Sequence, residues 1–202
     1  MTVKNLFTCF IIVALSFSSL ALSLSAYADA GSPKAEIEDT INRIIKTVAS
    51  TPDASVSTER RTKLRELINP KFNFAEMSRR SLGPNWNEIT ADEQREFTQV
   101  FSELLARTYL SKIETVKPGM VKVESESVET QKAVVKTVVI SKGDTFPIDY
   151  KLMVGTTGTW QVYDVVIENI GLVANYRNEF SGIIRKDKFS GLMERLRNKL
   201  NQ

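Results

Sequence analysis

The sequence contains no histidine and only one cysteine, Cys9. Without histidine the chain can hold neither an imidazole-based catalytic triad nor the common zinc sites. A single cysteine cannot build a disulfide framework, and Cys9 lies in an N-terminal segment that we expect to be removed. Without these residues, catalysis would have to depend on carboxylate or phenol side chains. The absence of histidine and of paired cysteines therefore argues against most classes of enzyme, but not against all.

The chain also lacks a strong excess of either positive or negative charge. The chain has 27 lysines and arginines against 24 aspartates and glutamates, a formal net charge of +3, and so small a surplus argues neither for nor against an acidic partner. No stripe of basic residues interleaved with aromatic ones appears, so we expect no nucleic-acid partner. The sequence also lacks a glycine-rich phosphate loop, metal-ligand spacing and a nucleophile elbow. We therefore predict no catalytic residue, no metal and no cofactor.

The first 28 residues have the pattern of a secretory signal peptide. Lys4 supplies a positive start, residues 6–24 are apolar apart from serines and Thr8, and Ala26-Tyr27-Ala28 places small residues at the cleavage positions. We predict cleavage after Ala28. The alternative is an uncleaved anchor, because the apolar run is nearly long enough to span a bilayer. Residues 29–202 would then form a single domain.

Helical periodicity dominates residues 33–116. Ser32-Pro33 opens a helix with an apolar stripe of isoleucines, a charged helix covers about 57–68, and Asn73 caps a short third helix. Thr90 to Glu93 forms a capping box that opens the longest helix, which Pro118-Gly119 ends. After the sheet region, apolar stripes predict two closing helices over 172–186 and 189–200.

Between these helices the apolar period changes from 3.6 to 2. Residues 121–123, 133–140, 148–154 and 160–167 read as four strands joined by turn-rich links short enough for hairpins. The first strand is polar on one side, as an edge strand should be. We therefore predict an α+β fold with a twisted four-stranded antiparallel sheet over 119–168, wrapped by N-terminal and C-terminal helices.

The fourth strand contains the nearest approach to catalytic chemistry, Tyr163-Asp164. In some enzymes a carboxylate abstracts a proton from the substrate while a phenol donates a hydrogen bond to it. Adjacent residues on a regular strand point to opposite faces, however. We therefore predict that Asp164 is structural and is bonded to the backbone or to an arginine.

Three stretches resemble one known family. "FNFAEMSRRSLGPNW" (72–86), "REFTQVFSELLARTYLSKIE" (95–114) and "WQVYDVVIENIGLVANYRNEF" (160–180), in this order and with the closing "GLMERLRNKL" (191–200), resemble the MlaC, or toluene-tolerance, family of periplasmic phospholipid-binding proteins. The resemblance covers essentially all of residues 29–202. It departs at Asn169-Ile170-Gly171, where the family usually has glycine at the first position and serine at the third.

The resemblance implies a carrier in a Gram-negative periplasm and not an enzyme. Such proteins shuttle phospholipid between an outer-membrane lipoprotein–porin complex and the lipid-binding ring of an inner-membrane ABC transporter, which maintains outer-membrane lipid asymmetry. It also implies an elongated apolar pocket that holds acyl chains while the headgroup stays exposed. The alternatives are a carrier of another apolar ligand, a histidine-free isomerase-like enzyme and a purely structural subunit.

The candidate wall of this pocket consists of apolar and aromatic residues from the long helix, two strands and the first closing helix. They are Phe97, Phe101, Leu104, Leu105, Tyr109, Tyr150, Leu152, Tyr163, Val165, Ile167, Leu172, Val173, Tyr176 and Phe180. Ordinary core packing explains each of them equally well. Glu168, Ile170 and Arg177 are the candidates for the pocket mouth and for contact with a partner protein. Glu168 and Ile170 follow the end of the apolar strand, and the guanidinium of Arg177 suits the boundary between tails and phosphate.

Overall fold

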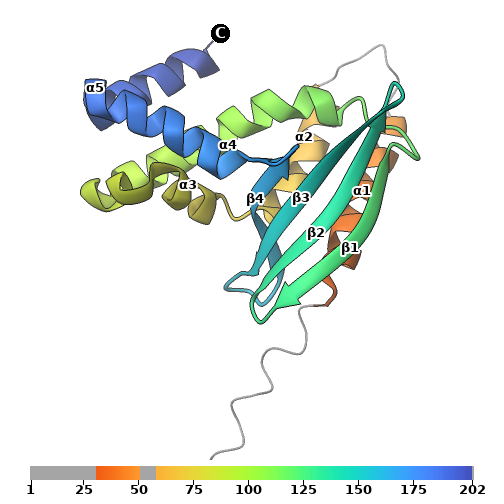
Figure 1. Cartoon of the computed structure of the whole chain (residues 1–202). Coiled ribbons are helices and arrows are strands. Elements are labelled where there is room, and N and C mark those ends of the chain that lie inside the picture. The colour runs from red at the N-terminus through yellow and green to blue at the C-terminus, as the bar shows by residue number, and fades with distance from the viewer. Residues whose placement is uncertain (1–30, 51–57, 202) are drawn as a thin grey trace, which may run out of the picture.

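The computed structural model describes residues 31–50 and 58–201 (Figure 1). The predicted signal peptide lies outside these residues. Within the described ranges no helix is both long enough and apolar enough to cross a membrane.

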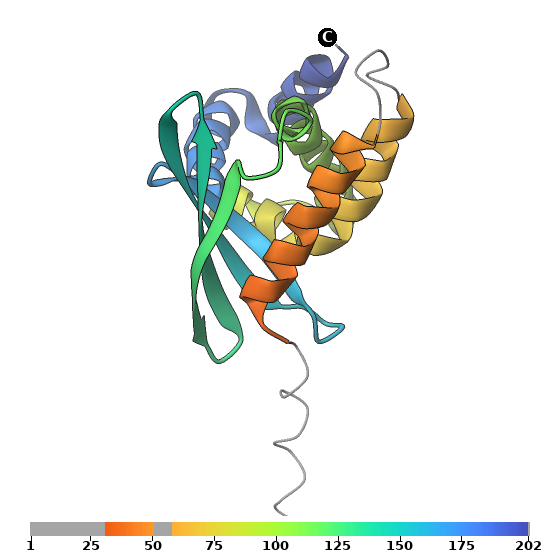
Figure 2. The same ribbon diagram turned by 90° about the vertical axis from the view of Figure 1, so that its right-hand side faces the viewer.

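The described residues form five α-helices, which lie over one face and one end of the sheet (Figures 1 and 2). They are α1 (Pro33–Ala49), α2 (Thr58–Ile68), α3 (Phe74–Leu82), α4 (Ala91–Ile113) and α5 (Leu172–Leu200), with 3₁₀ turns at η1 (Asn69–Lys71) and η2 (Gly83–Glu88). The predicted caps are present: Ser32 accepts a hydrogen bond from the Ala35 N–H, and Thr90 and Glu93 form the reciprocal capping box. These local bonds satisfy backbone donors that a helix start leaves open, which is why the helix starts were readable from the sequence.

The sheet has five antiparallel strands in the order β1-β2-β3-β4-β5. They are β1 (Val121–Glu129), β2 (Lys132–Ser141), β3 (Asp144–Val154), β4 (Trp160–Ile167) and β5 (Ile170–Gly171). The prediction of four strands was therefore wrong. Glu168 and Asn169 adopt φ angles of 49° and 68°, so a two-residue turn reverses the chain and pairs Ile167 with Ile170.

A bulge in β4 overturns the prediction that Tyr163 and Asp164 face opposite sides. Val162 pairs with Leu152, but Asp164 already pairs with the preceding residue, Lys151, so Tyr163 is the extra residue. Val162 and Val165 consequently pack in the same apolar cluster although they are three positions apart. The two residues between them share the other side of the sheet.

The last helix changes direction at Lys188. This residue has φ 61° and ψ −179°, which interrupts α5 between the two helices predicted from the sequence. Figure 1 shows the second part of α5 folding back over the first. Leu192, Met193 and Leu196 on this second part are buried against the other helices.

Two separate apolar clusters result. The helical core joins α3, α4 and α5 and contains Met77, Leu82, Phe97, Phe101, Leu104, Leu105, Val173, Tyr176, Phe180, Leu192, Met193 and Leu196. The sheet core joins α1 to one face of the sheet and contains Ile37, Ala133, Val135, Leu152, Trp160, Val162 and Val165. Figure 2 shows α1 running diagonally across the sheet, while Figure 1 shows α3, α4 and α5 gathered at one end of it.

Candidate functional site

The predicted wall residues divide between the two cores. Eight belong to or pack against the helical core: Phe97, Phe101, Leu104, Leu105, Tyr109, Val173, Tyr176 and Phe180. Four belong to or pack against the sheet core: Tyr150, Leu152, Val165 and Ile167. Leu172 contacts both, and Tyr163 lies on the other side of the sheet. The structure therefore does not bring all of them around one space.

The helical core is closed. Phe97, Phe101 and Phe180 are completely buried, and their ring centroids lie 5.5 to 5.7 Å apart. Tyr176 adds an edge-on contact to Phe101 at 5.1 Å, and its burial raises the pKa of its phenol to about 12. The expected elongated pocket is not found among these described residues, because their own rings fill the space between α4 and α5.

The sheet core is only partly covered. Ile148, Tyr150, Val154 and Ile167 on the sheet stay half-buried, although they face the same cluster. The stripe of α1 shows the same gradient, since Ile37 is buried and the residues after it, Ile41, Ile44, Ile45 and Val48, are half-buried. The helix thus covers the sheet closely at its N-terminal end and loosely beyond it.

Polar contacts hold the N-terminal end of α1 against the sheet. The Ser32 hydroxyl and the Lys34 backbone N–H both donate to the Glu126 carboxylate, the latter at 2.7 Å. The Trp160 indole N–H donates to the Gly31 carbonyl at 3.0 Å. Lys71 forms an ion pair with Glu36 in the first turn. Four contacts from three elements therefore fix this end of the helix.

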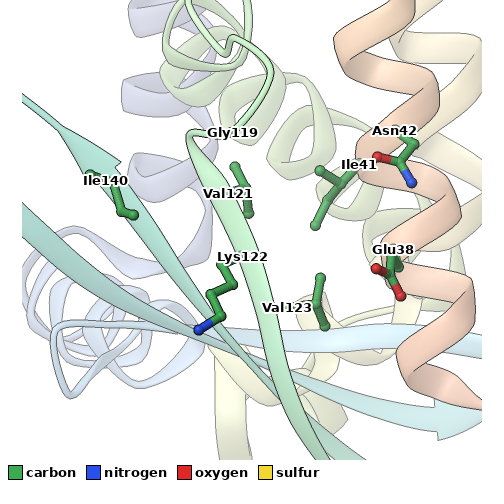
Figure 3. A pocket seen from close by; sticks show the side chains of 8 residues that line it. All are labelled: Glu38, Ile41, Asn42, Gly119, Val121, Lys122, Val123 and Ile140. Atoms are coloured by element: carbon green, nitrogen blue, oxygen red, sulfur yellow. The ribbon is translucent and has the colours of Figure 1, made fainter.

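A pocket of about 340 Å³ opens between the loosely covering part of α1 and the edge strand β1. It is lined by Glu38, Ile41, Asn42, Gly119, Val121, Lys122, Val123 and Ile140. Figure 3 shows the side chains of Ile41, Val121 and Val123 in the gap between helix and strand, with Glu38 and Asn42 on the helix beside it. Because Ile41 and Val123 also pack against the sheet core, the pocket continues the apolar surface of that core.

Sequence reasoning missed this opening. Ile41, Val121 and Val123 were recognised as apolar positions of a helix and a strand, but none was assigned to a pocket wall. The sequence contained only a weak sign of the opening, an isoleucine stripe on a helix and two valines at the start of an edge strand, Val121 and Val123.

A second pocket of about 490 Å³ lies on the last part of α5 and is largely polar. It is lined by Asp187, Ser190, Gly191, Glu194, Arg195 and Asn198.

Tyr163 and Asp164 have structural partners. The Arg80 guanidinium lies 4.4 Å from the centre of the Tyr163 ring. Asp164 accepts from the Val173 backbone N–H at 3.1 Å and from Lys151 at 3.4 Å. The carboxylate therefore caps the start of α5, where exposed N–H groups favour an anion. The expected backbone bond is present, while a lysine stands where an arginine was the other expected partner.

The three predicted mouth residues do not form one group. The Arg177 Nε donates to the Arg80 carbonyl at 2.6 Å, so this side chain satisfies a carbonyl near the C-terminal end of α3. Glu168 lies in the exposed turn between β4 and β5, and Ile170, which follows this turn, is 64% exposed.

No group of three or more potential metal ligands occurs among the residues that the structure describes.

Comparisons with known proteins agree with this geometry. The family model described as MlaC protein matches residues 38–198. A solved structure of a phospholipid-binding protein from Ralstonia solanacearum, in complex with a phospholipid, superposes with a TM-score of 0.76 at 24% sequence identity. The match covers 87% of this chain and 98% of that one, and at this identity it establishes the fold. A comparison with curated proteins gives no match.

Proposed function

The chain belongs to the MlaC family, whose model spans residues 38–198, and from this premise we propose that it carries phospholipid through a Gram-negative periplasm. In this proposal it shuttles lipid between an outer-membrane lipoprotein–porin complex and the lipid-binding ring of an inner-membrane ABC transporter, and so maintains outer-membrane lipid asymmetry. The shared fold with a phospholipid-bound protein supports the ligand class.

One observation carries the proposal: the apolar face under α1 is incompletely covered. Ile41 on the helix and Ile148, Tyr150 and Ile167 on the sheet are apolar or aromatic and half-buried. Ile41 also lines the pocket between α1 and β1. Leaving such surface in water is unfavourable, at about 25 cal/mol for each Å². An acyl chain inserted between helix and sheet would remove that surface from water together with its own.

The size of a phospholipid determines how much apolar surface the protein must provide. A diacyl lipid with roughly 30 methylenes gains on the order of 25 kcal/mol from burial of its tails. A pocket of about 340 Å³ lies at the small end of ligand sites, so it is too small for both tails as it stands. We expect loading to move the loosely covering part of α1 away from β1, while the contacts of Glu126 and Trp160 keep its first turn in place.

Within this proposal the predicted wall residues have two roles. Tyr150, Leu152, Val165 and Ile167 in the sheet core, with Leu172 beside them, contact the tails. The eight residues in the helical core stabilise the arrangement of α3, α4 and α5 and do not contact lipid. The headgroup stays in water at the rim formed by Glu38 and Asn42, because burying a charged phosphate would cost much of its hydration energy.

Mass spectrometry of organic extracts from the purified protein tests the function. Diacyl phospholipid at about one per protein is the expected result. Another apolar molecule at that ratio would identify a carrier of a different ligand. A protein that carries nothing, even after incubation with phospholipid vesicles, would contradict the proposal and favour an enzyme or a structural subunit.

The turn at Glu168 and Ile170 provides a second element of the proposal, a docking surface for the partner that receives lipid. Ile170 is 64% exposed, more than the exposed Val128 and Ile140, and it begins β5 directly after the two-residue turn at the end of β4. Exposed apolar patches mark interaction sites, and in this proposal Ile170 supplies the apolar contact for the partner.

Replacing Ile170 by glutamate should leave the free energy of unfolding within about 1 kcal/mol, because the side chain buries little surface. Lipid content should also be unchanged, but growth of cells on detergent with a chelator should fail. Val128→Glu is the matched control, since Val128 is 49% exposed on β1, away from the turn. A variant of Ile170 that supports growth as well as the control would remove the turn from the docking surface.

A further inference from the structure

Helix α5 reverses its direction at a single strained residue. Lys188 has φ 61° and ψ −179°, a combination that is essentially confined to glycine because a Cβ atom crowds the backbone there. The residues on both sides of it are helical, so Lys188 alone separates the first part of α5 from residues 189–200. A strained residue of this kind persists only where the surrounding contacts hold it.

The reversal also crowds two neighbouring residues. A Cβ atom added to Gly191 would lie 2.4 Å from the Cβ atom of Asp187, far closer than ordinary contact. The two positions are four residues apart, and in a regular helix the Cβ atoms of such residues lie about 5–6 Å apart. The close approach therefore belongs to the reversed form of α5 and would disappear in a straight helix. The strain at Lys188 would disappear with it, because a straight helix needs no positive φ.

The contacts that hold residues 189–200 in place are mainly apolar. Three of their side chains are at most 4% exposed and belong to the helical core: Leu192, Met193 and Leu196. The polar contacts to α4 are exposed and contribute little, namely the ion pair of Arg197 with Glu96 and the bond from Arg107 to the Leu200 carbonyl. Apolar packing therefore keeps the reversed form in the majority, while the strain raises the share of the straight form.

We propose that Lys188 is a hinge and that residues 189–200 form a strap, which detaches from α4 when α5 straightens. The first part of α5 stays in place, because it is held by its own contacts, such as the bond from the Val173 backbone N–H to Asp164 at 3.1 Å. Local opening of this kind exposes one segment while the rest of the fold remains closed. The hinge depends on the packing of α4 and α5 alone, and not on what the pocket between α1 and β1 holds.

Oxidation by hydrogen peroxide tests the hinge on the full chain without any label. Met193 on the strap is 3% exposed, and Met77 on α3 is 1% exposed in the same helical core. Opening of the strap exposes Met193, whereas Met77 becomes accessible only when the core unfolds. Met193 should therefore be converted to the sulfoxide roughly tenfold faster than Met77, as measured by mass spectrometry of peptides. Equal rates would mean that the strap opens only together with the core, and would overturn the hinge.

Two substitutions should shift the opening in opposite directions. Gly191→Ala should raise the oxidation rate of Met193 about fivefold or more, because the added methyl group meets Asp187 only in the reversed form. Lys188→Gly should lower that rate about fivefold, because glycine adopts the positive φ without strain. Gly182→Ala is the matched control: Gly182 lies on the first part of α5, and a Cβ atom there meets no atom within 4 Å.

The hinge requires a faster rate in Gly191→Ala, a slower rate in Lys188→Gly and an unchanged rate in the control, and any other pattern overturns it. If Met77 and Met193 were both oxidised faster in Gly191→Ala, the methyl group would be destabilising the whole core, which also contradicts a strap that opens by itself. Lys188→Gly relieves strain and the first comparison uses the unaltered chain, so the test does not depend on a variant that fails to fold.

Discussion

Replacing Val123 by tryptophan should reduce phospholipid loading at least tenfold without unfolding the protein. Val123 lines the pocket between α1 and β1 and also packs against the sheet core. An indole at this position would occupy the gap that an acyl chain has to enter. Loading would then require the ring to leave an apolar site, and a tenfold loss corresponds to only about 1.4 kcal/mol. Lipid content after incubation with vesicles gives the measurement.

Val128→Trp is the control for this variant. Val128 lies on the same strand but is 49% exposed and does not line the pocket, so its replacement should leave loading unchanged. Thermal unfolding of both variants separates blockage from damage to the fold. Normal loading by a folded Val123→Trp protein would show that the tails enter by another route.

Replacing Glu114 by alanine should lower the free energy of unfolding by about 3–5 kcal/mol. The Arg60 and Glu114 side chains are 6% and 8% exposed, and their Nε and Oε1 atoms lie 3.6 Å apart. Arg61 approaches the same carboxylate at 3.3 Å. Removing the carboxylate would leave the buried Arg60 charge without this counter-ion, and the loss should appear as a lower midpoint in denaturant unfolding. The pair ties the start of α2 to the end of α4.

Glu103→Ala provides the comparison. Glu103 pairs with Arg65 between the same two helices, but both side chains are 33% exposed, so water compensates for the lost partner. Its removal should cost at most about 1 kcal/mol. Equal effects of the two substitutions would mean that water reaches Arg60 when Glu114 is absent, and that burial does not set the strength of this pair.

Local signals predicted much of the fold correctly, because each acts within a few residues. The capping box of Thr90 and Glu93 and the cap at Asn73 are bonds between near neighbours, and both helices begin where these residues indicated. The turn before β5 is equally local, but it was missed because its residues carry no clear signal. It requires positive φ at Glu168 as well as Asn169, and a glutamate gives little sign of that conformation in a sequence.

The site was harder to predict, because its geometry depends on residues far apart in the chain. The bulge at Tyr163 arises from the register between β3 and β4, which no pattern within β4 reveals. Phe97 and Ile41 both belong to apolar helix stripes, yet the first is completely buried by other rings and the second lines an opening. Periodicity identifies which face of a helix is apolar, but the packing of other elements decides whether that face is closed.

The reversal of α5 at Lys188 has a consequence for how the chain is made. Leu192, Met193 and Leu196 complete the helical core, and they are synthesised long after the rings that they cover. Phe97 and Phe101 come about 90 residues earlier and cannot be fully enclosed until those residues arrive. The helical core of a nascent chain therefore stays incomplete until about 90 residues after Phe101 have been added.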